Sequence, residues 1–72
     1  MNNAIQLIRP STFEEGKDYL FLERQADTRA PTMVPVMFVR YDPCPAIVIV
    51  RDLMGKRRRC PREDLFDQVF YV

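Results

Sequence analysis

The chain has 72 residues, so its length predicts a single domain over residues 1–72. Hydrophobic residues make up 47% and charged residues 29%, a composition typical of a folded rather than a disordered chain. The formal net charge is +1, which excludes a strongly basic or strongly acidic protein. The longest apolar stretch, residues 46–50, is too short to cross a bilayer, so no membrane partner is expected.

The first ten residues are expected to form either a short strand or a loose pairing arm. Ala4, Ile5, Leu7 and Ile8 supply the apolar character, and Pro10 ends the segment. Ser11 and Glu14 then have the spacing of a helix capping box. This spacing, with Gly16 at the end, predicts one short helical turn.

Three strands are expected in the middle of the chain, because aromatic and β-branched residues alternate between turn residues. They cover residues 19–22, 33–41 and 46–51. The polar residues 25–32 are expected to form a loop, and residues 42–45 a stiff turn with two prolines. Pro35 lacks an amide proton, which places it at an edge, at a bulge or near the start of its strand.

A tight turn over residues 52–55 is followed by a fourth strand over residues 56–60, with Gly55 suited to a positive φ. The remaining residues allow two interpretations. Either a helix runs from Pro61 through Phe70, or one helical turn over residues 61–66 precedes a closing strand. The second interpretation is preferred.

The turn also predicts the strand register. If Asp52 pairs with Lys56, then Val50 lies opposite Arg58 and Val48 opposite Cys60. Cys44 then lies roughly 13 Å from Cys60 along the strands, farther than the approximately 7 Å that a disulfide tolerates. Two free cysteines are therefore expected. Cys60 is either a small core residue or, beside three arginines, a thiol of lowered pKa.

The central strands are apolar on both faces. Val34, Val36 and Phe38 alternate with a second apolar set on the same strand, so both faces need cover. The cover is either the ends of this chain or another chain. This second set, together with Ile47 and Ile49 of the next strand, gives the candidate protein interface: Met33, Met37, Val39, Tyr41, Ile47 and Ile49.

The order of elements resembles that of Src-homology-3-like small β-barrels. Phe13, Gly16 and Tyr19 precede a strand, a loop and a strand–turn–strand meander follow, and a basic strand runs into residues 61–66 before the last strand. The resemblance covers residues 13–72. It implies five strands with a single helical turn before the last one, whereas the tryptophan that several members use for ligands is absent. The expected fold class is mainly β, a small five- to six-stranded antiparallel barrel or strongly bent sheet with one or two single helical turns.

A basic segment is the most prominent polar feature. Residues 51–62 contain six basic residues and one acidic residue, a local net charge of +5. Three interpretations remain open: phosphate-backbone binding, a charged edge strand that blocks strand addition, and an acidic protein partner. The candidate nucleic-acid contacts are Arg51, Lys56, Arg57, Arg58, Arg59 and Arg62. Aromatic residues on the strands could stack on bases, but core packing is the more usual role.

An enzyme is not expected. The absence of histidine removes a Cys–His nucleophile, and two cysteines without histidine do not make an ordinary zinc site. Catalytic residues, metal and cofactors are therefore predicted to be none. No apolar run of signal-peptide length follows Met1, so a cytoplasmic location is expected. The favoured function is a small β module that binds a protein partner or itself through apolar strand faces, and nucleic-acid binding is the alternative.

Overall fold

The computed structural model describes the backbone of residues 4–24 and 32–71, and the side chains of residues 6–24 and 32–68. It contains six strands and one short 3-10 helix. They are β1 (Ala4–Ile8), β2 (Asp18–Glu23), β3 (Thr32–Tyr41), β4 (Ile47–Arg51), β5 (Arg57–Pro61), η1 (Arg62–Asp64) and β6 (Leu65–Tyr71). The predicted loop at residues 25–32 lies outside the described residues except for Thr32, which begins β3.

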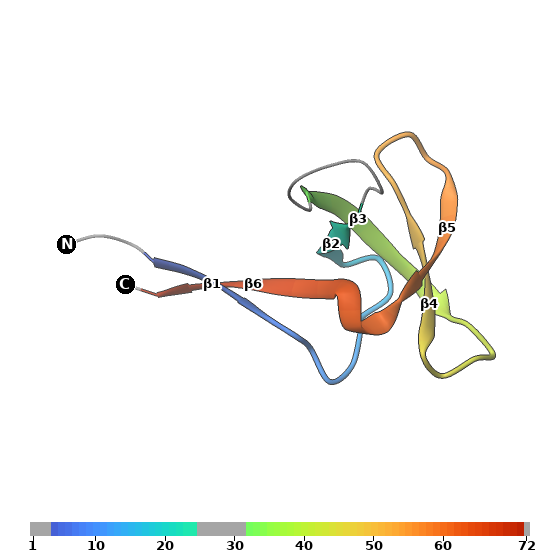
Figure 1. Ribbon diagram of the computed structural model, residues 1–72, viewed down its shortest axis with the longest axis horizontal. Helices are drawn as coiled ribbons and strands as arrows, with labels where there is room; N and C mark the ends of the chain where they lie inside the picture. Colours follow the sequence, from blue (N-terminus) through green and yellow to red (C-terminus); the bar gives the residue numbers. More distant parts are fainter. Residues whose placement is uncertain (1–3, 25–31, 72) are drawn as a thin grey trace.

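The strands form one antiparallel sheet in the order β1-β6-β2-β3-β4-β5. The mainly β prediction is confirmed in its bent-sheet form, because β1 and β5 remain at the two edges and the sheet does not close into a barrel. Figure 1 shows that β1 and the end of β6 form a long two-stranded ribbon, which projects from the body built by β2 to β5. Within the predicted segment, Ala4–Ile8 thus forms a strand rather than a loose arm.

One face of the sheet carries the hydrophobic core. We call it the core face, and the opposite side the outer face. Strand alternation places Tyr19, Phe21, Val36 and Phe38 on the core face, where all four are buried. The cluster is completed by residues from the neighbouring segments: Phe13, Val48, Val50, Cys60 and Leu65.

The β4–β5 hairpin has the predicted register. Val50 lies opposite Arg58, and Val48 lies opposite Cys60. Asp52 donates its backbone N–H to the Lys56 carbonyl at 2.9 Å, and Gly55 has a φ of +82°. The tight turn needs a residue that tolerates positive φ, and Gly55 places the turn at this point of the chain. The position of the turn then determines which residues of β4 and β5 lie opposite each other.

A β-bulge in β3 corrects one part of the face prediction. Phe38 pairs with Val50, but the next pair is Arg40 with Ile49, so Val39 is an inserted residue. The insertion reverses the alternation, and Tyr41 points to the core face, with its ring centroid 5.1 Å from that of Phe38. The prediction that Tyr41 shares a face with Met33 and Met37 is therefore wrong.

Pro35 occupies a locally unpaired side of β3. Strand β4 pairs with β3 only from Met37 onward, so β2 is the one described strand that pairs with Thr32–Val36. Phe38 donates its N–H to the Lys17 carbonyl on the β2 side. Backbone alternation then points the Pro35 nitrogen away from β2, where no ladder hydrogen bond is lost. This agrees with a position near the strand start.

The segment before β2 is a β-turn rather than the predicted helical turn. Lys17 donates its N–H to the Glu14 carbonyl at 3.1 Å, and Gly16 has the expected positive φ of +82°. Glu14 does not complete a capping box but donates its own N–H to the Tyr19 hydroxyl at 2.8 Å. The Tyr41 hydroxyl accepts the Phe13 N–H in the same way, also at 2.8 Å.

The tail follows the preferred interpretation, a single helical turn and then a strand. The helix η1 spans Arg62–Asp64, and β6 follows it directly. β6 pairs with β2 through Leu65 and Phe66 and then with β1 through residues 67–71. The continuous helix through Phe70 is wrong, because Leu65 already has extended backbone angles. Within residues 4–24 and 32–71, no helix is long and apolar enough to cross a membrane.

Candidate interaction face

The outer face of β3, β4 and β5 brings together residues that the sequence suggested for two different sites. Residues that pair directly across antiparallel strands share a face. Met37 pairs with Arg51, and Arg51 pairs with Arg57, so these three form one row across the sheet. Both arginines are exposed, and no salt bridge to a described residue involves either of them.

A second row lies beside the first. Ile49 pairs with Arg40 on one side and with Arg59 on the other. Ile49 is only 6% exposed although it does not belong to the core cluster. Long arginine side chains can cover apolar surface with their methylene groups while their charged ends stay in water. The second row is therefore an apolar centre between two exposed guanidinium groups.

We call Arg40, Arg51, Arg57 and Arg59 the arginine face. One carboxylate within it is engaged: Asp42 accepts a hydrogen bond from Arg59 at 3.2 Å. The pKa of Asp42 is lowered, first by the hydrogen bond that its Oδ1 accepts from the Cys44 N–H and also by Arg59. Four guanidinium groups and this carboxylate leave a net charge of +3.

Arg58 lies on the opposite side of β5. Its register partner is the buried Val50, so Arg58 belongs to the core face. It forms a 3.0 Å salt bridge with Glu23, and its guanidinium carbon lies 5.5 Å from the centre of the Phe21 ring. The Glu23 hydrogen bond raises the pKa of Arg58. These contacts give Arg58 a structural role at the border of the core.

The last two residues of the predicted basic set do not belong to the two paired rows of the arginine face. Lys56 is in the hairpin turn between β4 and β5, and Arg62 begins η1. Arg62 donates a 2.9 Å hydrogen bond to the Ser11 carbonyl, and its guanidinium carbon lies 5.7 Å from the centre of the Phe13 ring. The structure thus gathers Arg51, Arg57 and Arg59 and separates them from Arg58 and Arg62.

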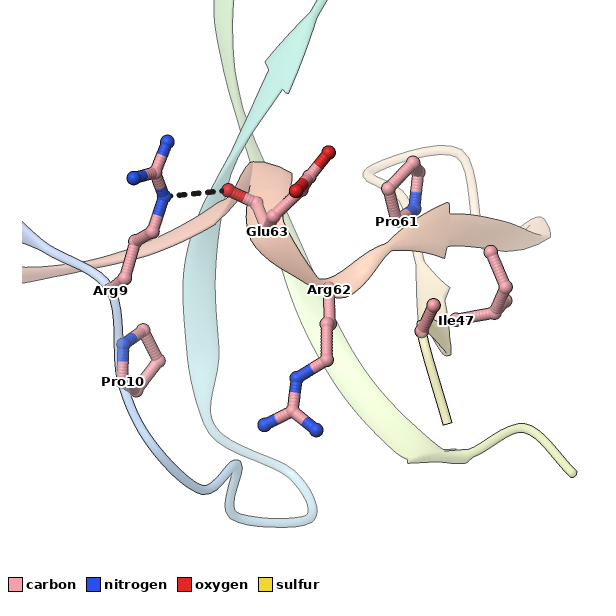
Figure 2. A pocket seen from close by; sticks show the side chains of 7 residues that line it. Arg9, Pro10, Ile47, Pro61, Arg62 and Glu63 are labelled. Atoms are coloured by element: carbon pink, nitrogen blue, oxygen red, sulfur yellow. Dashed lines mark hydrogen bonds between the residues drawn. The ribbon is translucent and has the colours of Figure 1, made fainter. Parts of the chain in front are cut away.

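Arg62 also lines a surface pocket of about 500 Å³. Figure 2 shows that Arg9 and Arg62 extend in different directions there, with Pro61 and Ile47 on the other side. Arg9 donates a 3.0 Å hydrogen bond from Nε to the Glu63 carbonyl, and the Glu63 side chain is among the lining residues. The two guanidinium groups do not converge on one position, so this pocket is a weaker anion site than the arginine face.

The predicted apolar interface residues have mixed positions. Met33, Met37, Val39 and Ile47 are half-buried, Ile49 is buried, and Tyr41 is on the core face. The outer face continues beyond Met37 toward a groove of about 440 Å³. This groove is lined by Leu20, Pro35 and Phe66, with Asp18 and Asp67 at its border. The apolar surface therefore has a basic end at β4–β5. At β2–β6 it carries Asp18 and Asp67, and Asp67 is paired with Lys17 at 2.8 Å.

The two cysteines differ in their surroundings, and the buried one is unsuited to act as a nucleophile. Both are free, with Cys44 exposed and Cys60 buried opposite Val48. Burial raises the pKa of the Cys60 thiol, which is the reverse of what a nucleophile needs. Among the described residues, no group of three or more metal-ligating side chains comes together.

Sequence reasoning missed Arg40 as a member of the arginine face. Uninterrupted alternation from Phe38 would place Arg40 among the core residues, and only the bulge turns it outward. The order of Arg40 and Tyr41 in the sequence does indicate the bulge. A charged residue at an expected core position, followed by an aromatic residue at an expected outer position, indicates an inserted residue.

Comparisons with known proteins give no relative: no family model matches the chain, and neither a curated protein nor a solved structure is significantly similar. The fold and the residues of the chain are thus the basis for its function.

Proposed function

We propose that this protein is a non-enzymatic binding module that recognises an acidic, partly apolar protein surface with the outer face of β3, β4 and β5. The observation that carries the proposal is the direct pairing of Arg51 with Arg57 on the same face as Met37. Like charges directly opposite each other are unfavourable in a free sheet, and an anionic partner removes this repulsion.

The composition of the face supports a protein partner. Protein interfaces are enriched in arginine and methionine and depleted in lysine. The face has four arginines, and its rows also contain Met37 and Ile49. The half-buried Met37 beside the exposed Arg51 and Arg57 fits a partner in which carboxylates flank a hydrophobic side chain.

The strand order supports placing the domain among Src-homology-3-like small barrels as part of the same proposal. Without β1, the order is β6-β2-β3-β4-β5, and a 3-10 turn directly precedes the last strand. Five strands with a single helical turn before the last one are what the resemblance implies. A fold of this kind is a scaffold for binding surfaces and does not itself specify the ligand.

Fluorescence anisotropy with a labelled peptide rich in glutamate, leucine and phenylalanine tests the proposal. We expect binding that weakens when Arg57 is changed to Glu and stays nearly unchanged in Lys56→Glu. The second variant makes the same charge change at the neighbouring residue, which lies in the turn. Equal losses in the two variants, or no binding at low salt, would contradict the proposal.

Nucleic-acid binding is the second candidate, and the exposed Arg51–Arg57 pair favours it because guanidinium groups bind phosphates in two-pronged contacts. Base stacking has less support, since Tyr19, Phe21 and Phe38 are buried in the core. A labelled single-stranded oligonucleotide distinguishes the candidates. Changing Met37 to Ser should weaken peptide binding and leave oligonucleotide binding almost unchanged, because phosphate contacts do not need an apolar side chain.

A further inference from the structure

The two edges of the sheet differ in how they are protected. At one edge, β5 contains Arg57, Arg58, Arg59 and Pro61, and charges and proline on an edge strand prevent the addition of another strand. At the other edge, the β1 sequence Ala-Ile-Gln-Leu-Ile has no charge, proline or glycine. This contrast indicates that β1 is the edge at which a further strand can pair.

The ribbon that contains β1 lacks support within the described part of the chain. β1 pairs with β6 over five residue pairs, while β6 pairs with β2 only through Leu65 and Phe66. Figure 1 shows the ribbon extending away from the other strands. A two-stranded ribbon is marginally stable in water, and Leu7 and Ile8 are 41% and 37% exposed. Additional strands would stabilise this part of the fold.

We propose that β1 pairs with β1 of a second copy, antiparallel about a twofold axis, to give a four-stranded ribbon. The strand sequence is symmetric in character about Gln6, with two apolar residues on each side. An antiparallel pairing centred on Gln6 therefore places apolar residues opposite apolar residues and brings no like charges together. The proposal concerns a different surface from the arginine face and goes beyond the proposed function.

The symmetry of the β1 sequence indicates that the strand added at this edge is β1 of a second copy. In a twofold interface each contact occurs twice, so one strand with a self-complementary sequence is sufficient. Every second residue of an edge strand directs its N–H and C=O outward, and these groups supply the main-chain hydrogen bonds of strand addition. The arginine face lies toward the β5 edge, at the far end of the strand order from β1, and remains available in such a dimer.

Sedimentation equilibrium over a range of concentrations tests the proposal. We expect a reversible monomer–dimer equilibrium that Gln6→Glu weakens roughly fivefold at low salt and less at high salt, because two carboxylates then face each other across the axis. Gln68→Glu is the matched control, since Gln68 is exposed on β6 of the same ribbon and pairs with Leu7 rather than at the free edge. A monomer at all concentrations, or equal weakening by the two variants, would overturn the proposal.

Amide hydrogen exchange of the wild-type protein gives a second measurement that does not depend on a variant. Alternate amides of β1 point outward in the monomer and become hydrogen-bonded in the dimer. We expect their protection to rise with protein concentration. A dimer in which these amides exchange freely pairs elsewhere, and that result would also overturn the proposal. Protection that appears only when a different protein is added would identify a foreign strand as the occupant instead.

Discussion

Arg51 and Arg57 are direct cross-strand partners on β4 and β5, and they share their face of the sheet with Met37. Two exposed guanidinium groups directly opposite each other on neighbouring strands repel each other. On the opposite face of β5, Arg58 is instead paired with Glu23. Among the described residues, the hairpin therefore has a salt-bridged arginine beside the core, whereas Arg51 and Arg57 on the outer face form no salt bridge.

Changing Arg57 to Glu should stabilise the free protein, because the substitution replaces a like-charge pair with an opposite-charge pair. We expect the free energy of unfolding to rise by about 0.5 kcal/mol at low salt and by less at high salt. Urea denaturation at two salt concentrations measures both values. Arg58→Gln is the control on the other face, and it should destabilise by about 1 kcal/mol because the Glu23 contact is lost. A lower free energy of unfolding for Arg57→Glu than for the wild type would contradict a repulsion between Arg51 and Arg57.

The hydroxyl groups of Tyr19 and Tyr41 should contribute unequally to stability. Each accepts a backbone N–H at 2.8 Å, from Glu14 and Phe13 respectively. Tyr19 is 3% exposed and Tyr41 is 44% exposed, so water replaces the lost acceptor more easily at Tyr41. We expect Tyr19→Phe to cost about 1.5 kcal/mol and Tyr41→Phe about 0.5 kcal/mol. Thermal denaturation of both variants measures the two losses. A larger loss of stability in Tyr41→Phe than in Tyr19→Phe would contradict the prediction.

The two thiols should differ in reactivity. Cys44 is exposed, whereas Cys60 is buried and its pKa is raised by that burial. Alkylation requires the thiolate and access to it. With iodoacetamide at mildly alkaline pH, we expect one rapid modification at Cys44, and modification of Cys60 only in denaturant. Peptide mass mapping checks the positions, and rapid labelling of native Cys60 would contradict its place in the core.

Asp42 should make the fold sensitive to acid. Its pKa is lowered in the folded protein by the Cys44 N–H and by Arg59, so its contribution is complete above the ordinary aspartate pKa. The contribution is lost as the pH falls through the lower folded value. Asp42→Asn keeps an oxygen for the Cys44 N–H but removes the charge. We expect this variant to lose less stability between neutral and acidic pH than the wild type, measured by urea denaturation at each pH. An equal loss would show that Asp42 does not contribute to this pH dependence.

The predictable parts of the fold are those that depend on local chemistry. Gly55 and Asp52 determine a tight turn, and the turn determines the register from Val50 to Cys60. The pairing of β1 with β6 joins residues 59 to 67 positions apart, and no local signal specifies it. The sequence predicts individual residues of the binding face but not their arrangement. Arg51 and Met37 were assigned to different candidate surfaces because their common row depends on strand order and on pairing between β3 and β4.

The most direct test of the proposed binding face is a titration followed by ¹H–¹⁵N nuclear magnetic resonance, with the acidic apolar peptide and the oligonucleotide added in separate experiments. We predict that the peptide shifts the amide signals of Met37, Arg40, Ile49, Arg51, Arg57 and Arg59. The shifts should weaken in Arg57→Glu and persist in Lys56→Glu. Shifts that cluster at the Arg9–Arg62 pocket, or no shifts on the outer face with either probe, would contradict the proposal that this face binds a partner.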